Sequence, residues 1–257
     1  MKVVIFCGGR GLRIREHAEA VPKPMVKIGY RPILWHVMRT YAHYGHREFI
    51  LCLGYRADAI KEYFLNYSET ISNDFVMSGG GREIELLGSD IADWRITFAD
   101  TGLNATIGER LLAVRRHLAG EEIFLANYGD VLSDVPLDRV VADFAASDAV
   151  ASLVAVKPPY SFHVVEGTGN QVTGVRDIAA STLRINGGYY AFRQGIFDML
   201  GDGKDLLDGP FQRLIAEGRL HAFPYDGFWM SLDTIKEYQA LLALEESGSA
   251  PWAAWRG

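Results

Sequence analysis

The sequence predicts an α/β fold in which short buried strands alternate with helices. Two observations carry this prediction. Apolar runs rich in β-branched residues, at 2–7 and 48–53, end at glycines and are typical of buried strands. The segments that follow them, 31–44 and 57–66, have apolar residues that recur at helical spacing. Such a βαβ unit is joined by a right-handed crossover, so we expect its strands to be parallel.

The first half of the chain continues this alternation. Pro32 suits the first turn of the first helix, and Gly45 is a plausible stop for it. Asp58 lies near the start of the second helix, where the helix dipole favours a carboxylate. The segment 68–93 is less regular. The strands expected here are 2–7, 48–53, 83–87, 94–99 and 122–127, and the helices are 31–44, 57–66 and 108–118.

The second half is expected to be richer in strands. Pro136 is suited to open a helix, and the stretch 162–178 reads as a β-hairpin with its turn at 167–170. Asp233 is a natural N-cap for the last helix. No linker, repeat or low-complexity tract interrupts the chain, so we treat residues 1–257 as a single domain. The remaining strands are expected at 150–156, 189–192, 220–224 and 228–232, and the helices at 137–147 and 234–245.

Composition narrows the class of protein. The net charge is −6 and there is no basic run, so we expect no nucleic-acid partner. Cys7 and Cys52 lie in apolar runs without disulfide or zinc spacing and read as small buried hydrophobes. No secretory leader and no apolar stretch long enough to span a bilayer is evident, so we expect no membrane partner and a cytoplasmic location.

The first strand runs into a glycine-rich turn that points to phosphate binding. Gly8-Gly9-Arg10-Gly11-Leu12-Arg13 follows it directly, and glycines let backbone N–H groups approach phosphate oxygens closely. Lys23 follows between Pro22 and Pro24, which stiffen the chain on both sides of its charge. We therefore expect Arg13 and Lys23 to act on transferring phosphoryl groups. The alternative for the glycines alone is a tight turn that needs positive φ.

Two carboxylates follow predicted strands. Asp130 comes just after the strand 122–127, and Asp233 just after 228–232. Ligands of open α/β sheets bind at the carboxyl ends of strands, and a carboxylate beside bound phosphate needs a cation between them. Asp130 and Asp233 are therefore candidate Mg²⁺ ligands. The alternative is that each caps a turn or a helix, and for Asp233 the cap and metal roles can coexist.

The end of the chain is unusually aromatic. Trp252 and Trp255 lie within the last six residues. One interpretation is that they pack on the body of the same subunit. The other is that they form a contact between subunits, and on that basis we expect a homo-oligomer.

Motifs spread along almost the whole chain resemble those of the glucose-1-phosphate cytidylyltransferase branch of the sugar-phosphate nucleotidylyltransferases. Their order and number make the resemblance far more specific than any single motif. The matching residues are Gly8-Gly9, Gly11, Arg13, Pro22-Lys23-Pro24-Met25-Val26, Pro32-Ile33-Leu34-Trp35-His36, Gly54-Tyr55, Ile60-Lys61-Glu62-Tyr63-Phe64, Asp100-Thr101-Gly102, Thr106, Gly108, Arg110, Tyr128-Gly129-Asp130, Ile185-Asn186-Gly187-Gly188, Gly227-Phe228-Trp229, Asp233-Thr234 and Ala250-Pro251-Trp252.

The resemblance implies a Rossmann-like three-layer α/β/α fold with a mixed, mostly parallel central sheet. It implies Mg²⁺-dependent transfer of CMP from CTP, or of another nucleotidyl group from its triphosphate, to a phosphorylated acceptor, with release of pyrophosphate. Asp130 and Asp233 would hold the Mg²⁺, Arg13 and Lys23 would be catalytic, and Asn186 and Gly187 would lie near the sugar. The nucleotide-binding residues that it implies are Gly8, Gly9, Gly11, Arg13, Thr106, Arg110, Tyr128 and Gly129.

The acceptor half departs from the family pattern. Where the family has Thr, this chain has Leu12, and the family's Glu-Lys-Pro before Asn-Gly-Gly is missing from 175–180. Arg176 or Arg184 could replace that Lys, although Arg and Lys differ in reach and geometry. His163 lies where the family prefers Gly within an Arg-aromatic-Gly motif. We expect His163 and Arg176 to belong to an altered acceptor site. The alternatives are an ordinary glucose-1-phosphate cytidylyltransferase and a catalytically silent, nucleotide-binding regulatory subunit.

Overall fold

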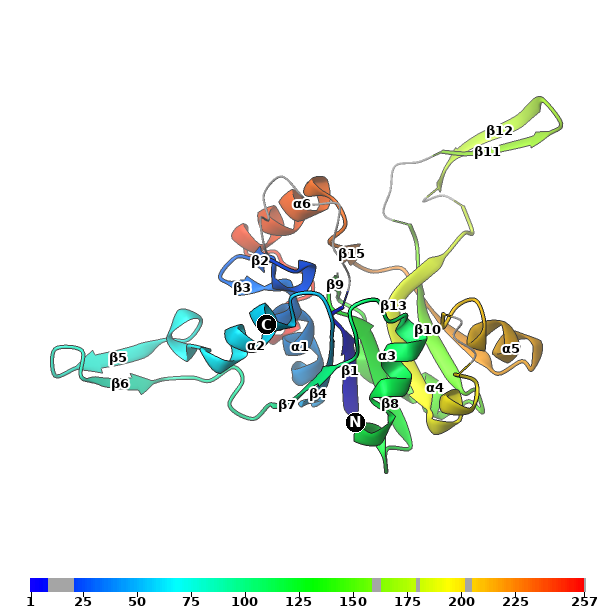
Figure 1. Cartoon of the computed structure of the whole chain (residues 1–257). Coiled ribbons are helices and arrows are strands. Elements are labelled where there is room, and N and C mark those ends of the chain that lie inside the picture. Colours follow the sequence, from blue (N-terminus) through cyan, green and yellow to red (C-terminus); the bar gives the residue numbers. More distant parts are fainter. Residues whose placement is uncertain (9–20, 159–162, 179–180, 202–204, 257) are drawn as a thin grey trace.

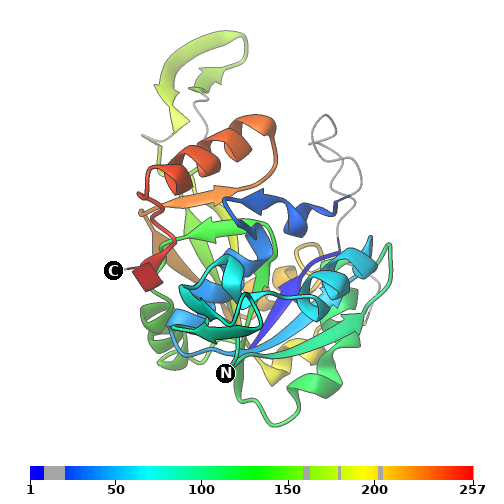
Figure 2. The ribbon, with the colours of Figure 1, turned by 90° about the vertical axis from the view of Figure 1, so that its left-hand side faces the viewer.

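A seven-stranded sheet runs through the centre of the chain (Figures 1 and 2). The computed structural model describes residues 1–8, 21–158, 163–178, 181–201 and 205–256. Six of the sheet's strands are parallel to one another, and β13 alone is antiparallel to its neighbours. In spatial order the strands are β14 (Leu220–Tyr225), β10 (Ala151–Val156), β13 (Ile185–Arg193), β8 (Ile123–Tyr128), β1 (Lys2–Phe6), β4 (Glu48–Leu53) and β7 (Arg95–Asp100).

Helices cover both faces of this sheet, which confirms the predicted three-layer, mostly parallel fold. One buried cluster gathers apolar side chains of α1, α2, α4 and α6. A second gathers those of α3 and α5 on the opposite face. The helices are α1 (Ile33–His43), α2 (Ala57–Leu65), α3 (Ile107–Ala113), α4 (Leu137–Ala145), α5 (Pro210–Ala216) and α6 (Ile235–Glu246).

Several predicted ends of elements were wrong, and three of them have a clear local reason. The first helix begins at Ile33, because Arg31–Pro32 pairs as the short strand β3 with β2 (Lys27–Ile28). β13 begins at Ile185 and so includes the Asn-Gly-Gly motif, where the ladder with β10 is irregular. Thr234, not Asp233, caps α6: its hydroxyl accepts the Glu237 N–H in a full capping box.

Two hairpins extend from the body on different sides (Figure 1). One is formed by β5 (Phe75–Ser78) and β6 (Glu83–Leu86), of which only the second was predicted. The other is formed by β11 (His163–Thr168) and β12 (Gln171–Asp177), as the sequence predicted. A further small ladder pairs β9 (Val131–Ser133) with β15 (Trp229–Ser231) beside the carboxyl end of β8. None of the described helices is long and apolar enough to cross a membrane.

The aromatic tail packs on its own subunit. Trp252 is completely buried, and its ring contacts those of His36 and Phe228. Trp255 meets Trp35 edge to face. The first of the two interpretations of the tail therefore describes this chain. The expectation of a homo-oligomer stays a prediction, but the packing of the tail on its own subunit means that the tail is not evidence for it.

Candidate functional site

The carboxyl ends of β1 and β8 enclose a pocket of about 320 Å³. Parallel strands end at one edge of the sheet, and this is where open α/β folds bind ligands. Gly8, Lys23, Thr106, Arg110, Tyr128 and Asp130, which the sequence predicted as site residues, all line this pocket. Gly9, Gly11 and Arg13 lie outside the described residues.

Lys23 joins the two predicted metal ligands. Its ammonium Nζ lies 2.5 Å from Oδ2 of Asp130 and 2.7 Å from Oδ1 of Asp233. Lys23 and Asp130 are mostly buried, and Asp233 is 37% exposed. Residues more than a hundred positions apart thus converge on one point beside the pocket.

The local structure explains how these three side chains meet. Lys23 begins a 3₁₀ turn, Lys23–Met25, whose Pro24 is buried. Asp130 follows β8 and precedes β9, and its backbone carbonyl accepts the Leu232 N–H at 2.9 Å. That bond continues the β9–β15 ladder and brings the two aspartates to one end of it.

The side chain of Asp233 faces this cluster. Ser231 donates its hydroxyl to Oδ2 of Asp233 at 2.6 Å, while Oδ1 binds Lys23. Because Thr234 caps α6, a capping role for the Asp233 side chain is not needed. Asp130 precedes a strand, so it caps no helix either.

The cluster has unusual electrostatics. Burial raises the pKa of the Asp130 carboxyl above its ordinary value, although the Lys23 ammonium acts in the opposite direction. Burial lowers the pKa of Lys23, but attraction to Asp130 and Asp233 outweighs it and leaves that pKa raised. Perturbed groups that meet in a pocket are typical of functional sites.

The donor set fits Mg²⁺ bound partly by substrate. Among the described residues, no group of three or more His, Cys, Asp or Glu side chains could form an all-protein metal cage. Mg²⁺ is usually held by one or two carboxylates together with substrate phosphates and water. Asp130 and Asp233 provide that pair, and Lys23 now balances the charge that the cation would otherwise balance.

Arg110 lines the pocket and holds the neighbouring strand ends together by hydrogen bonds. Its guanidinium is 1% exposed and donates to the carbonyls of Leu53 and Gly8, at 3.1 and 2.6 Å. It also donates to Oγ1 of Thr101 at 2.8 Å. These bonds tie the ends of β1, β4 and β7 to α3. The sequence predicted Arg110 near the nucleotide. It could not show that the guanidinium donates to backbone carbonyls of the protein itself.

Two glycines of the predicted nucleotide site have close neighbours that leave little room for a side chain. A Cβ on Gly8 would lie 2.1 Å from Nη1 of Arg110. A Cβ on Gly129 would lie 3.2 Å from the Phe6 carbonyl and would crowd Pro24. Thr106 is the N-cap of α3, and its hydroxyl accepts the Glu109 N–H at 3.2 Å. The expected helix 108–118 is replaced by a shorter one, which ends at Ala113, and by a separate 3₁₀ turn over Arg115–Leu118.

A chain of hydrogen bonds links the pocket to Asn186. Asn186 donates to the hydroxyl of Tyr190 at 2.6 Å, and Tyr190 donates to that of Tyr128 at 2.9 Å. Tyr128 lines the pocket. The Gly187 carbonyl accepts the indole N–H of Trp229 at 2.7 Å. The structure thus links Asn186 to the pocket wall, and sequence reasoning missed Tyr190 as the link.

The structure does not bring His163 and Arg176 to this place. Both lie on the β11–β12 hairpin, which extends away from the body in Figure 1. Arg176 forms an ion pair there with Glu166.

Other cations lie nearer to Asn186. Arg184 donates to Asp226 at 2.9 Å and to the carbonyls of Ala155 and Tyr225. Lys157, whose Nζ lies 3.7 Å from Asp226, is a further cation at this sheet edge. The sequence contained no signal for Lys157, because its neighbours come from separate segments.

Comparisons with known proteins concern the family and the fold of the chain. A family model described as nucleotidyl transferase matches residues 2–246. The chain is 35% identical to the glucose-1-phosphate cytidylyltransferase of Salmonella typhimurium over 257 residues, which cover 99% of this chain and 100% of that one. The Salmonella typhi relative gives the same values. The solved structure of UTP-bound UGPase from Acinetobacter baumannii has a TM-score of 0.70 and 19% identity, covering 97% of this chain and 95% of that one.

Proposed function

This chain belongs to the nucleotidyl transferase family, and from that membership we propose that it transfers CMP from CTP to a phosphorylated acceptor. It is an enzyme of the sugar-phosphate nucleotidyltransferase type, as its motifs predicted. The nucleotide and the acceptor are the parts that we propose. The choice of CTP follows the names of the Salmonella relatives.

The observation that carries the proposal is the meeting of Lys23, Asp130 and Asp233 beside the pocket. A phosphate oxygen of the acceptor attacks the α-phosphorus of the triphosphate. The bond from that phosphorus to the oxygen bridging to the β-phosphate breaks, and pyrophosphate leaves with the electron pair. The attacking group is already anionic, so no general base is required, and positioning and charge stabilisation supply the rate.

Asp130 and Asp233 would hold the Mg²⁺, which when bound neutralises charge on the phosphates. Lys23 would share these two carboxylates with a bound divalent cation, and its ammonium would then be available to neutralise phosphate charge. Arg13 and the glycine turn would complete the proposed triphosphate site, with Thr106 and Tyr128 in its wall and Gly129 next to Tyr128.

The acceptor site is where we propose a departure from the relatives. The hydrogen bonds that link Asn186 to Tyr128 through Tyr190 support a place for Asn186 and the neighbouring Gly187 near the acceptor. The Lys that the family has before Asn-Gly-Gly is absent from the sequence, and Arg184, which differs from Lys in reach and geometry, is the cation closest to that motif. Unpaired polar groups in a site discriminate strongly between substrates, so we propose that glucose 1-phosphate is a poor acceptor. A different phosphorylated or phosphonate-like molecule would be better. The alternative is the ordinary glucose-1-phosphate activity.

A pyrophosphate-release assay tests both levels of the proposal. Four nucleoside triphosphates are each combined with glucose 1-phosphate and with a panel of other phosphorylated acceptors, in Mg²⁺. We expect release with CTP and an acceptor other than glucose 1-phosphate. A kcat/KM of about 10⁴ M⁻¹s⁻¹ or higher with glucose 1-phosphate would restore the ordinary activity. Release with no combination, together with tight triphosphate binding, would favour the regulatory subunit.

Matched variants test the metal site. Asp130→Asn and Asp233→Asn keep the size of each side chain and remove its charge. Each should abolish turnover and weaken Mn²⁺ binding, measured by electron paramagnetic resonance in the presence of CTP. Ser231→Ala, which removes only the hydroxyl that orients Asp233, serves as the control and should retain most of both. Near-normal activity of either Asn variant would remove that residue from the metal site.

A further inference from the structure

Asp205 is a pocket residue that the sequence did not predict. It lines the pocket of about 320 Å³ together with Tyr128. Its carboxylate Oδ1 accepts the Leu206 N–H at 2.8 Å. Its backbone carbonyl accepts two further N–H groups of the turn before α5, each at 3.2 Å. These bonds fix the position of the carboxylate, so its negative charge is a built part of the pocket.

The cations of the pocket are already matched by other groups. Lys23 pairs with both Asp130 and Asp233. Arg110 is buried and donates to backbone carbonyls. In the part of the chain that the structure describes, Asp205 forms no ion pair, and the hydrogen bond to its side chain comes from a neutral N–H. Its negative charge is therefore left without a positive partner.

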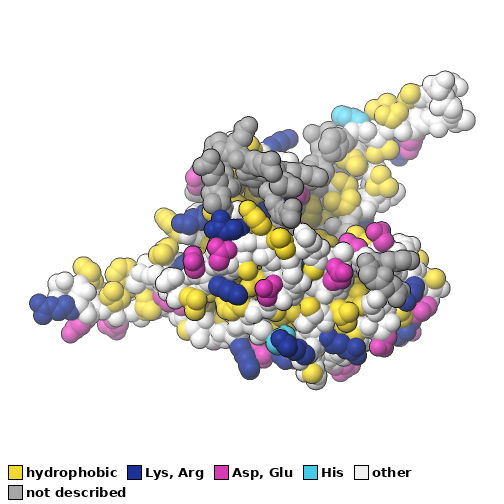
Figure 3. Space-filling model, in the orientation of Figure 1, with side chains coloured by type: hydrophobic (Ala, Val, Ile, Leu, Met, Phe, Trp, Pro, Cys, Tyr) yellow, Lys and Arg dark blue, Asp and Glu magenta, His cyan; other side chains and the backbone are white. Residues whose placement is uncertain are grey.

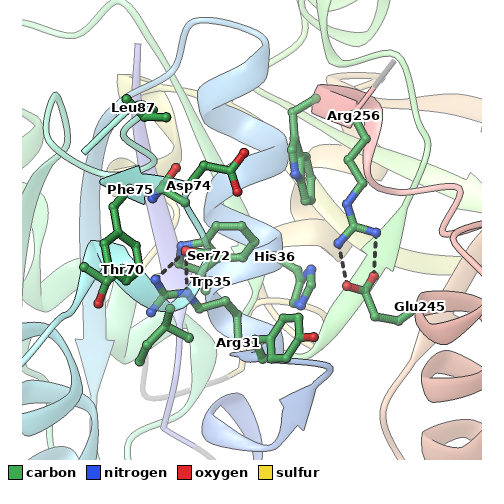
Figure 4. A pocket seen from close by; sticks show the side chains of 14 residues that line it. Arg31, Trp35, His36, Thr70, Ser72, Asp74, Phe75, Leu87, Glu245 and Arg256 are labelled. Carbon is green, nitrogen blue, oxygen red and sulfur yellow. Dashed lines mark hydrogen bonds and ion pairs between the residues drawn. The ribbon is translucent and has the colours of Figure 1, made fainter. Parts of the chain in front are cut away.

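A larger hollow on the subunit, of about 840 Å³, gives a contrast (Figure 4). There Arg256 donates to Glu245 at 3.0 Å, and Arg31 donates to the hydroxyl of Ser72 at 3.1 Å. Asp74, which also lines that hollow, is exposed to solvent. The charges of the larger hollow are thus paired or hydrated, and they do not select a ligand of either sign.

Bound substrates would make the unpaired charge of Asp205 unfavourable. Figure 3 shows acidic and basic side chains interspersed over the visible face, so no surface field of one sign compensates it. The triphosphate and the acceptor phosphate of the proposed reaction are both negative, and like charges repel. The proposed Mg²⁺ belongs to Asp130 and Asp233. A positive group on a substrate would remove the repulsion.

Asp205 lies close to the tyrosines that lead to Asn186. Burial raises the pKa of the Tyr128 and Tyr190 phenols, and the negative charge of Asp205 raises both further. Tyr190 joins Tyr128 to Asn186 by hydrogen bonds. The carboxylate therefore belongs to the side of the pocket where we place the acceptor, and not to the α3 side that contains Thr106.

We propose that Asp205 binds an ammonium group of the acceptor, so that the acceptor is a phosphorylated or phosphonylated amine and not a neutral sugar phosphate. This inference rests on the proposed function and names the class of its acceptor. The ammonium would form a charge-assisted hydrogen bond with the carboxylate, and the ring of Tyr128 would add an attraction for cations. A hydroxyl group would also donate to Asp205, but it would leave the negative charge in place.

The acceptor half has no competing cation for this carboxylate. Arg184 donates to Asp226 at 2.9 Å, and Arg176 is paired with Glu166 on the β11–β12 hairpin. The amine takes no part in the bond changes. The phosphate or phosphonate oxygen of the acceptor attacks the α-phosphorus and pyrophosphate leaves, as in the proposed reaction.

Matched pairs of acceptors test the proposal with the wild-type enzyme, CTP and Mg²⁺. Ethanolamine phosphate is compared with ethylene glycol monophosphate, and glucosamine 1-phosphate with glucose 1-phosphate. Within each pair the amine is replaced by a hydroxyl. We expect the amine of at least one pair to have a kcat/KM about tenfold higher or more, because the hydrogen bond to Asp205 is then charge-assisted. Equal values within both pairs, or higher values for the hydroxyl compounds, would overturn the proposal.

Two variants of the same turn assign the preference to its carboxylate. Asp205→Asn removes the charge and keeps an oxygen for the Leu206 N–H. It should lower the preference for the amine about tenfold or more, with the dissociation constant of CTP near that of the wild type. Asp208→Asn, which changes an exposed carboxylate three positions further on, is the control and should keep the preference. Circular dichroism and thermal unfolding establish that both variants are folded.

Binding measurements separate this inference from the proposed function. Calorimetry gives the dissociation constant of each acceptor in the presence of a non-hydrolysable CTP analogue. Amine-selective binding that Asp205→Asn abolishes, without any pyrophosphate release, would uphold the ammonium site and contradict the proposed transfer. Turnover without amine selectivity would uphold the transfer and overturn the ammonium site.

Two other results would overturn the proposal by giving Asp205 a different partner. Loss of bound Mn²⁺ in Asp205→Asn, with the amine preference unchanged, would place a metal ion at this carboxylate. Loss of discrimination between CTP and UTP, again with the preference unchanged, would place the amino group of cytosine there.

Discussion

The indole N–H of Trp252 donates to Nδ1 of His36 at 3.2 Å, although 216 positions separate the two residues. Nε2 of His36 lies 2.9 Å from the Ile28 carbonyl, which can only accept. Nδ1 must accept and Nε2 must donate, so the imidazole is neutral with its proton on Nε2. This single tautomer of His36 thus joins Trp252, near the end of the chain, to α1.

This contact predicts a pH dependence of stability. Burial lowers the pKa of His36 to about 4, against an ordinary value near 6.5. Between these values the unfolded chain binds a proton that the folded chain does not, so stability falls as the pH falls from about 6.5 to about 4. The full loss is roughly 3 kcal/mol. Urea unfolding of wild type and His36→Gln at pH 7.5 and 5.0 measures it, and the variant should lose less on acidification.

His46 provides a control for that experiment. Burial lowers its pKa to about 4 as well, but its side chain is only partly buried, so solvent reduces its effect. His46→Gln should therefore change the pH dependence less than His36→Gln does. Equal pH dependences in wild type and His36→Gln would contradict the assignment.

Lys23 is predicted to act on the transition state more than on binding. Lys23→Ala removes the ammonium that, in the proposed reaction, neutralises charge on the triphosphate while Mg²⁺ is bound by Asp130 and Asp233. We expect kcat to fall by about a hundredfold or more, with a much smaller change in the dissociation constant of CTP. Single-turnover kinetics and equilibrium binding separate the two. Weakened CTP binding with unchanged kcat would assign Lys23 to ground-state binding instead.

Arg110 is predicted to matter first for stability. Arg110→Met leaves the buried carbonyls of Gly8 and Leu53 without their donor. We expect the free energy of unfolding to fall by about 3 kcal/mol, because unpaired buried polar groups are costly. Urea unfolding measures this. Arg115→Met, which removes a cation at the start of the 3₁₀ turn that follows α3, is the control and should lose far less. A stable variant that fails only to bind nucleotide would give Arg110 a direct contact.

Two arginines can be compared as acceptor contacts. Arg184 lies two residues before Asn186, whereas Arg176 is paired with Glu166 on a hairpin that extends from the body. We expect Arg184→Gln to raise the KM of the acceptor at least tenfold, with the KM of CTP unchanged. Arg176→Gln should leave both constants near those of the wild type. The reverse result would show that the β11–β12 hairpin reaches the site.

The sequence predicted the sheet edge better than it predicted single side chains. Strand ends follow from β-branched runs that stop at turn residues, and this located both Asp130 and Asp233. The N-cap prediction failed at Asp233 because the next residue, Thr234, forms a capping box with Glu237. That Ser/Thr-x-x-Glu signal was present in the sequence. The carboxylate of Asp233 does not cap the helix and instead forms an ion pair with Lys23.

Other features lay beyond any local signal. Whether the Arg110 guanidinium faces solvent or the interior depends on three strand ends that only the folded sheet brings together. The apolar residues of the β5–β6 hairpin alternate as they would in a buried strand, and the sequence cannot tell that they stay exposed on this subunit. The aromatic tail required cover, but nothing local to it pointed to His36.

The contact between Gly8 and Arg110 constrains how this family can diverge. The guanidinium fills the space that any side chain at position 8 would need. A change at one position therefore affects the other: a larger residue at 8 must displace the guanidinium of Arg110, and loss of the arginine leaves the carbonyls of Gly8 and Leu53 without their donor. The two positions should drift together across descendants, so a library for new nucleotide specificity should randomise them as a pair.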